Sequence, residues 1–231
     1  MPSSKEDPPG SNPYLHLFFD TTEVAGDPDS SSLGRIGIDR LADAAKFLGS
    51  KIYVPDLVLE EIAYRRLRRL RERIKDAKET ATRVKAYVSV RIEKERTDDE
   101  LIAMFREETK GQLTHVSATV ISVGPVTLQK VLELSTRRIP PFSKADDPTG
   151  FHDAVVLLSV LEYAKLQQFR ACTFVSNDRD YAEWAIEKLA REYELTVVFE
   201  TDTRPLIEKL ERIRASASQA EADWLTRKET D

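Results

Sequence analysis

The chain has 231 residues, of which 41% are hydrophobic and 32% are charged. That length suits one α/β domain with an elaboration, or at most two small domains, and the composition provides a core beneath a highly charged surface. No apolar run approaches the roughly 18 residues that a membrane span needs, and the first residues contain no apolar signal core. The single cysteine, Cys172, excludes an internal disulfide and a multi-cysteine zinc site, and its apolar neighbours predict a buried thiol. We therefore expect a cytoplasmic protein that does not enter a membrane.

The charge is unevenly distributed along the chain. The net charge of −5 argues against general coating of nucleic acid. The segment from Tyr64 to Lys94, however, holds twelve Lys and Arg against four Asp and Glu, a local charge of +8 that leaves −13 for the remainder. Such a dipolar chain predicts a basic face for an anionic polymer and an acidic region elsewhere.

The N-terminal part of the chain contains two expected strands. Residues 1–13 are rich in Pro, Ser and Gly and predict a disordered lead-in to a single domain over residues 14–231. Tyr14–Phe19 predicts a buried strand that ends at Asp20, and Lys51–Val54 predicts a second strand. A helix is expected between them, from about Leu33 to Leu48.

A long helix is expected from about Asp56 to Lys94. Its apolar residues follow one another in steps of four and three, which makes a continuous stripe of near-heptad spacing. The stripe consists of Ala63, Leu67, Leu70, Ile74, Ala77, Ala81, Val84 and Val88. Such a helix would be roughly 55–60 Å long, so we expect it to bend or to project from the domain. A second helix is expected at Asp99–Lys110, whereas residues 111–126 carry no decisive pattern.

The rest of the chain alternates helices with strands. Helices are expected at Val126–Leu134, Phe151–Gln168, Asp180–Tyr193 and from Pro205 onward, strands at Ala171–Val175 and Leu195–Phe199, and a loop at Arg137–Gly150. Short strands that alternate with helices predict an α/β fold, a Rossmann-like parallel sheet with helices on both faces. In such sheets the ligand site lies beyond the carboxyl ends of the strands.

Acidic residues gather at that end of the predicted sheet. Asp20 follows the first strand directly, and Asp178 follows the third expected strand. Glu60 and Glu61 come shortly after the second strand, and Asp153 lies in the first turn of a strongly apolar helix. Each acid alone has a structural explanation, as a helix N-cap, a first-turn acid or a solvated helix residue. The functional prediction therefore depends on the whole set.

Carboxylates brought together in this way favour a bound metal ion. One pair 4 Å apart costs roughly 4 kcal/mol at an effective dielectric constant of 20, and a cation removes that cost. Oxygen ligands without a cysteine or histidine cluster favour Mg²⁺ or Mn²⁺ over Zn²⁺. The chemistry that fits is phosphodiester hydrolysis, in which metal ions activate water and stabilise the leaving oxygen.

Four segments, in this order, resemble the PIN-domain nucleases: Asp20 after the first strand, Val58–Ile62, Phe151–Val155 and Val175–Tyr181. The resemblance spans about Tyr14–Phe199. It implies a Rossmann-like sheet with an acidic pocket for Mg²⁺ or Mn²⁺, and endoribonuclease activity on single-stranded or structured RNA. Residues 65–135 look like a helical insertion. The chain is similar to a subgroup with such an insertion and an Arg-Arg-x-Pro-Pro loop, present here as residues 137–141.

The resemblance also implies roles for individual residues. The catalytic and metal-binding acids would be Asp20, Glu61, Asp153 and Asp178, and the supporting residues would be Thr22, Ser176, Asn177 and the more peripheral Asp180. Glu61 is preferred over Glu60 because the family places its acid directly before an apolar residue. Thr22 departs from the Asn that many members carry two residues after the first Asp, although a hydroxyl can also form hydrogen bonds.

Basic residues are candidates for contact with RNA. The predicted contacts are Arg65, Arg66, Arg68 and Arg69 beside the apolar stripe, and Arg137, Arg138 and Lys144 in the loop that leads to Asp153. They would bind phosphates with release of counterions. The alternative for the first group is a solvated helix face whose stripe packs on another helix or on a partner chain. His152 neighbours the acids, and a structural role is favoured for it.

Other protein classes fit the sequence less well. An aspartyl phosphatase needs Asp-x-Asp after the first strand, but Asp20 is followed by two threonines. A topoisomerase–primase-like domain lacks its Gly-rich glutamate motif here, and neither a dinucleotide fingerprint nor a P-loop is present. The remaining alternative is a catalytically weak PIN-like scaffold that binds RNA or protein. A homodimer, an antitoxin-like partner and cleavage of DNA are left open, since a metal site does not read the 2′-hydroxyl.

Overall fold

The computed structural model describes residues 12–25, 38–84, 96–124, 126–142 and 150–230, of which 38–39 and 217–230 by their backbone alone. The strands are β1 (His16–Phe19), β2 (Lys51–Pro55), β3 (Thr119–Ile121), β4 (Ala171–Val175) and β5 (Thr196–Glu200). The helices are α1 (Thr21–Val24), α2 (Ile38–Phe47), α3 (Asp56–Val84), α4 (Asp98–His115), α5 (Leu128–Thr136), α6 (Phe151–Leu166), α7 (Glu183–Glu192) and α8 (Thr203–Thr230), with a 3₁₀ turn at Pro13–Leu15. None of these helices, as far as they are described, is long and apolar enough to cross a membrane.

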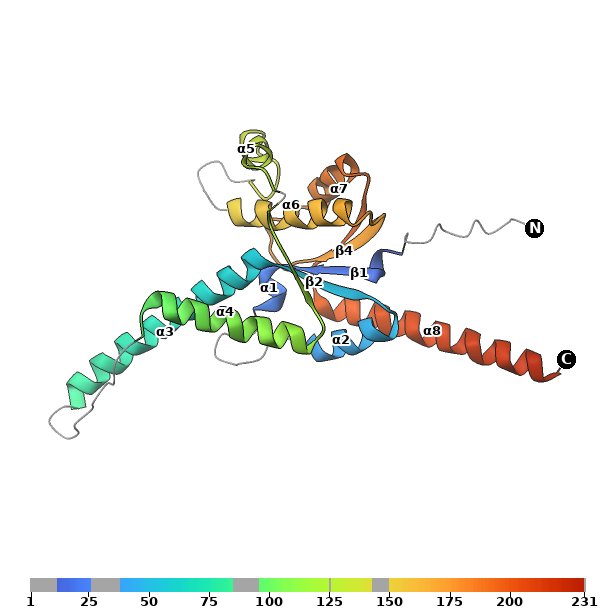
Figure 1. Cartoon of the computed structure of the whole chain (residues 1–231), viewed down its shortest axis with the longest axis horizontal. Coiled ribbons are helices and arrows are strands. Elements are labelled where there is room, and N and C mark those ends of the chain that lie inside the picture. The colour runs from blue at the N-terminus through green and yellow to red at the C-terminus, as the bar shows by residue number, and fades with distance from the viewer. Residues whose placement is uncertain (1–11, 26–37, 85–95, 125, 143–149, 231) are drawn as a thin grey trace.

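The five strands form one parallel sheet in the order β3-β2-β1-β4-β5. Helices α6 and α7 lie on one side of the sheet and α2 and α8 on the other (Figure 1). The predicted Rossmann-like α/β fold is therefore confirmed. From the central strand β1 the chain builds outward to β2 and β3, and then crosses to β4 and β5 on the other side. The strand order thus reverses between β1 and β4, which is where such sheets bind their ligands.

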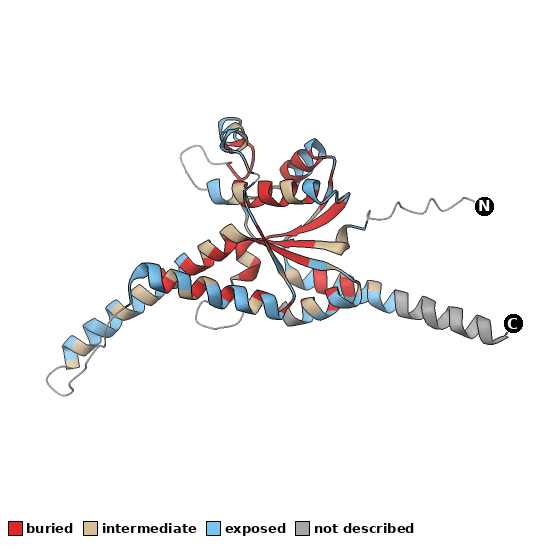
Figure 2. Cartoon of the chain, viewed as in Figure 1, coloured by how far each residue is buried: buried red, intermediate tan, exposed pale blue. Residues whose placement is uncertain are grey.

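The strands are buried because each is a short apolar run. Leu17, Phe18 and Phe19 of β1 are buried, and so is every residue of β4, including the thiol of Cys172. Half of the residues of α6 are also buried, as its predominantly apolar sequence predicts (Figure 2). Packing on all sides leaves these elements little freedom, so they hold the residues at their ends in fixed positions.

Helices α3 and α4 lie side by side and project from the sheet as a helical arm, the α3–α4 arm (Figure 1). With 29 residues, α3 is roughly 43 Å long. Ala63 and Leu67 of its apolar stripe pack against Leu101 and Phe105 of α4 in a small core of their own, apart from the main core. This section of the stripe therefore packs on another helix, which is one of the two alternatives that the sequence offers.

Strand β3 is a fifth strand that the sequence pattern does not indicate. It is three residues long and only Ile121 is buried, so no alternation of apolar and polar residues marks it. It pairs with β2 over the register Tyr53↔Thr119 to Pro55↔Ile121, and so it completes that side of the sheet. It also lies within residues 65–135, so this range contains a strand of the sheet. The helical insertion stays a prediction.

The remaining differences concern the ends of helices. Helix α7 begins at Glu183 and not at Asp180, α4 continues to His115, and the short helix α1 is not expected from the sequence. The expected helical segments at 33–37 and 85–94 lie outside the described residues, as do most of the N-terminal lead-in and Lys144.

Candidate active site

Asp20 stands at the carboxyl end of β1, and its side chain is only 2% exposed. It occupies the N-cap position of α1, but its side chain makes no capping hydrogen bond. Its Oδ2 accepts a hydrogen bond from Ser176 Oγ at 2.8 Å and another from Thr22 Oγ1 at 3.3 Å. The carboxylate is therefore held by one hydroxyl group from the start of α1 and one from the loop after β4, and the N-cap explanation does not apply to it.

The loop after β4 is joined to the start of α1 by the same hydroxyl groups. Ser176 Oγ accepts the backbone N–H of Asp178 at 3.1 Å, and Thr22 Oγ1 accepts that of Asn177 at 3.1 Å. The start of α1 and this loop meet because β1 and β4 are neighbouring parallel strands, with Phe19 opposite Val175. Three of the expected supporting residues thus contact Asp20 or each other.

Glu61 comes from the second turn of α3. It accepts a hydrogen bond from Thr21 Oγ1 at 2.6 Å and forms an ion pair with Arg65, one turn along the helix. Its neighbour Glu60 instead pairs with Arg106 of α4. The two adjacent glutamates therefore have different neighbours: Glu60 contacts α4, and Glu61 lies near Asp20.

Asp153 and Asp178 complete the acidic group. The pKa of Asp153 is raised to about 7, first by burial and then by the negative charges of Asp20, Asp178, Glu61 and Asp180. The pKa of Asp20 is raised to about 6, first by burial and then by Glu61 and Asp178, although the hydrogen bond from Ser176 lowers it. Five carboxyl groups thus share one electrostatic environment.

Asp178 does not cap α7. Its Oδ1 accepts the backbone N–H of Asp180 at 2.8 Å, which closes a local turn, while the N-cap position of α7 is Ala182. The turn fixes the direction of the Asp178 side chain next to Ser176. The N-cap explanation for Asp178 is therefore wrong.

The donor set suits a hard cation that keeps part of its water shell. Within the described part of the chain, no three His, Cys, Asp or Glu side chains are grouped so as to hold one ion. The acids offer oxygen donors, and the pKa values of Asp20 and Asp153 are raised by burial and by the negative charges of the other acids, a cost that a cation would relieve. Mg²⁺ is commonly bound through one or two carboxylates while several waters remain on it. The residues fit that mode better than direct ligation by all four acids.

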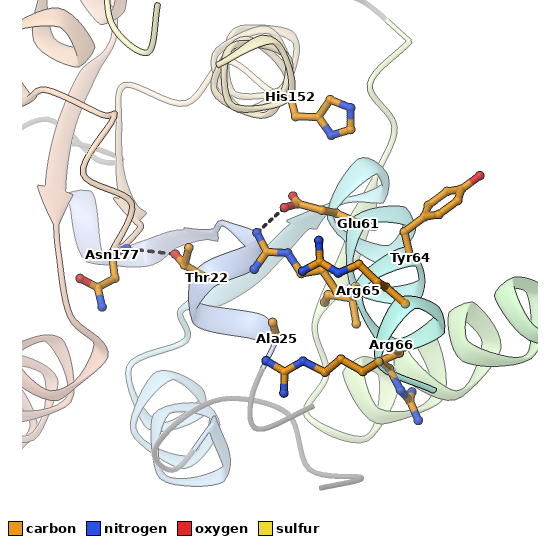
Figure 3. Close-up of a pocket in the computed structure, with 11 residues that line it drawn as sticks. Thr22, Ala25, Glu61, Tyr64, Arg65, Arg66, His152 and Asn177 are labelled. Atoms are coloured by element: carbon orange, nitrogen blue, oxygen red, sulfur yellow. Dashed lines mark hydrogen bonds and ion pairs between the residues drawn. The ribbon is translucent and has the colours of Figure 1, made fainter. Parts of the chain in front are cut away.

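A cavity of about 810 Å³ adjoins the acids (Figure 3). Thr22 and Ala25 line it from α1, His152 from α6 and Asn177 from the loop after β4. From α3 come Glu61, Ile62, Tyr64, Arg65, Arg66, Arg68 and Arg69. Among its described lining residues, the cavity is thus acidic only at Glu61 and basic along the arginine side of α3. His152 is exposed in it, so the structural role favoured for that residue is not supported.

The other basic candidates lie differently. Arg66 is engaged by α4, where it pairs with Glu108 at 2.7 Å and lies 4.4 Å from the centroid of the Phe105 ring. Arg137 pairs with Glu133 on its own helix at 2.9 Å, and neither it nor Arg138 lines the cavity. Of the seven predicted RNA contacts, the four on α3 border the cavity. One of these four, Arg66, is paired with a residue of α4.

Three residues near the acids receive no role from the sequence. Thr21 orients Glu61, as described above, and Tyr64 lines the cavity. Tyr181 is buried, and its hydroxyl donates a hydrogen bond to the backbone carbonyl of Asp153 at 3.0 Å. Burial, followed by the charges of the surrounding acids, raises the pKa of Tyr181, so it stays a neutral donor. Thr21 and Tyr181 lie next to the acids in the sequence, and this proximity is the only sequence feature that indicates a role for them at the site.

Comparison with known families agrees with this geometry. A family model described as PIN domain matches residues 17–181, which includes all four acids and most of the chain. The chain therefore belongs to the PIN-domain family. PIN domains are typically nucleases, which supports a hydrolase. Comparisons with curated proteins and with solved structures gave no significant match.

Proposed function

We propose that this protein is a metal-dependent endoribonuclease that hydrolyses RNA phosphodiester bonds at the acidic end of the sheet. The observation that carries the proposal is the burial of Asp20 among other carboxylates. Burying like charges together is unfavourable, and the raised pKa of Asp20 expresses that cost. Among the described residues, Asp20 has neither a capping nor an ion-pairing role. A group maintained at such a cost is typical of a functional site.

The proposed ion is Mg²⁺ or Mn²⁺, held by Asp20, Glu61, Asp153 and Asp178 in part through water. When bound, it would activate water and stabilise the leaving oxygen. The chain's own contribution is to fix these oxygens in place. Hydroxyl groups of Ser176 and Thr22 orient Asp20, the hydroxyl of Thr21 orients Glu61, and Tyr181 holds the backbone at Asp153. Outer partners of this kind commonly affect metal affinity about 10- to 100-fold.

Arginines on α3 would bind the phosphates of the substrate. Arg65, Arg68 and Arg69 border the cavity and lie one to two turns along α3 from Glu61. Phosphate neutralisation by such residues supplies affinity without reading sequence. The proposal places the reaction in the cytoplasm, where the single cysteine stays reduced. A homodimer or an antitoxin-like protein partner stays a prediction.

The alternative is a PIN-like scaffold that binds RNA or protein with weak or no catalysis. One observation favours it: among the described residues, no three acids are grouped to hold one ion. In that case the Arg65–Glu61 ion pair would be a permanent feature of the cavity, and not one that a metal ion replaces.

The experiment that separates these functions is cleavage of a labelled single-stranded RNA. The reactions contain Mn²⁺, EDTA, or Mn²⁺ with the Asp178→Asn variant. We expect cutting only by the unchanged chain in Mn²⁺, and a loss of more than about 100-fold in the variant, beyond the effect of an outer partner. The Asp43→Asn variant, which changes an exposed carboxylate of α2, serves as the matched control.

Cutting that persists in EDTA would refute the metal-dependent mechanism. Cutting that persists in Asp178→Asn would remove that residue from the site. If no reaction shows cutting, the unchanged chain and the Asp178→Asn variant are each titrated with Mn²⁺ and the binding is measured by calorimetry. Equal affinity of the two chains for the ion would favour the scaffold.

A further inference from the structure

Tyr64 is an aromatic side chain exposed within the cavity beside the acids. It is 59% exposed and lies on α3, one turn from Glu61 (Figure 3). Large aromatic side chains usually bury most of their surface or find a partner ring. Among the described residues, Tyr64 has neither an aromatic contact nor a hydrogen bond. Its position therefore has no explanation in the stability of the fold.

The cavity side of α3 combines this ring with cations. Positions 61, 64, 65, 68 and 69 follow the i, i+3, i+4, i+7, i+8 spacing of a single helix face. The opposite face carries Ala63 and Leu67, which pack on α4. Arg68 and Arg69 are exposed and, within the described part of the chain, form no ion pair, whereas Arg66, at the border of the two faces, is engaged by α4.

We propose that Tyr64, Arg68 and Arg69 form a binding site for one unstacked nucleotide of a single-stranded RNA, with the base stacked on Tyr64 and the adjoining phosphates on the two arginines. The inference rests on the proposed function, since it names the form of substrate that the same site accepts. It adds Tyr64 as the residue that selects an exposed base, one helical turn, about 5.4 Å, from the acid Glu61.

The combination of features favours a single strand over other partners. A groove that places an aromatic face next to guanidinium groups is the usual arrangement for single-stranded nucleic acid, because every base has a π-face. In a duplex the bases are already stacked, and extruding one costs a few kcal/mol. An acidic peptide would satisfy the arginines but leave the ring without a planar partner.

The test is binding in EDTA, so that neither metal ion nor cleavage contributes. Fluorescence anisotropy compares a short single-stranded RNA, the same ribose-phosphate strand without bases, and the blunt duplex. We expect Tyr64→Ala to weaken binding of the single strand by about 5- to 150-fold, the equivalent of roughly 1–3 kcal/mol for one stacked base. Binding of the baseless strand and of the duplex should not change, and Tyr64→Phe should bind like the unchanged chain.

The arginines are tested through the dependence of binding on salt. Replacing both in Arg68→Gln/Arg69→Gln should reduce the slope of log affinity against log salt by about 0.7 for each phosphate that is no longer neutralised. The matched controls are Arg83→Gln, an exposed arginine further along α3, and Trp184→Ala, an aromatic residue of α7 that is 58% exposed and does not line the cavity. Both controls should leave the affinity and the slope unchanged.

Equal affinity of Tyr64→Ala for the single strand, or an equal reduction for the baseless strand, would overturn the inference, and so would the absence of measurable binding by the unchanged chain at low salt. Cleavage in Mn²⁺ is scored separately. If the chain cuts RNA but binds it independently of Tyr64, the nuclease activity is supported and the nucleotide site at Tyr64 is refuted. If the chain binds RNA through Tyr64 but does not cut it, the nucleotide site is supported and the nuclease activity is refuted.

Discussion

The acidic end of the sheet and the α3–α4 arm use charge in opposite ways. At the end of the sheet, Asp20 is buried and Asp153 half-buried next to other carboxylates, and the pKa values of both are raised. In the arm, opposite charges are paired, as in Arg66 with Glu108 and Arg71 with Asp98. The first arrangement raises the free energy of the fold, and the second is neutral or mildly favourable.

This difference separates residues that serve function from residues that serve structure. The arm places its ion pairs around a small apolar core, so each pair has a local structural explanation. Asp20 at the end of the sheet has no such explanation, because the hydroxyl groups of Ser176 and Thr22 hold its carboxylate in place without neutralising it. On α3 both arrangements meet, since Arg66 faces the arm while Arg65 pairs with Glu61.

We expect the greatest change in stability from removing the charge of Asp20 in the absence of metal. Asp20 has a folded pKa of about 6, above its ordinary value of 3.8. The stability it contributes is therefore fully present below about pH 4 and is lost as the pH rises through 6. The shift corresponds to about 3 kcal/mol at high pH, as an order of magnitude. We expect Asp20→Asn to be more stable than the unchanged chain at pH 8 by about 2–3 kcal/mol and equally stable at pH 4.

Urea unfolding in EDTA at the two pH values measures this effect. Asp43→Asn, at an exposed carboxylate of α2, is the matched control and should show no such difference. Adding Mn²⁺ should reverse the order, because an ion that binds only the folded unchanged chain stabilises it by mass action. A variant that is less stable than the unchanged chain at pH 8 in EDTA would mean that Asp20 is a structural residue.

An intermediate effect is expected at the start of α6, which carries Asp153. Gly150 has φ +95°, and a Cβ there would lie 2.7 Å from the carbonyl oxygen of Pro141. Gly150→Ala should therefore destabilise the fold by about 1–3 kcal/mol and lower cleavage by displacing Asp153. Gly111→Ala, in α4, is the opposite case: a Cβ there meets nothing within 4 Å, so the helix should gain about 0.5–1 kcal/mol.

Thermal and urea unfolding of the two glycine variants distinguish strain from a general effect of alanine. If Gly150→Ala unfolds like the unchanged chain, the contact between the loop and α6 does not position Asp153.

The smallest effect is expected in the arm. The ion pair of Arg71 with Asp98 is largely exposed, at 35% and 58% of the two side chains, and Nε lies 2.8 Å from Oδ1. Arg71→Gln should change the free energy of unfolding by less than about 1 kcal/mol, and the change should disappear in roughly 1 M salt. Cleavage should be unaffected. A change of several kcal/mol, or a loss of cleavage, would show that the ion pairs of the arm contribute to the site.

Much of the fold follows from local pattern. The strands β1, β2, β4 and β5 are predictable because each is a run of four or five residues rich in apolar side chains, ending at a polar or turn residue. The strand β3 is not, since three residues with one buried side chain carry no periodicity. Its place in the sheet depends on hydrogen bonds to β2, which are made between segments more than 60 residues apart.

The sequence by itself determined the PIN-domain fold and the order of the four acids, because a buried strand followed by Asp and an apolar helix that begins with Asp are local features. Only the tertiary structure decided what surrounds them. Ser176 meets Asp20, Glu61 faces the acids while Glu60 faces α4, and Tyr64 is exposed in the cavity that the arginines of α3 border. Those contacts arise where distant segments pack together, and the spacing of residues along one segment carries no information about its distant neighbours.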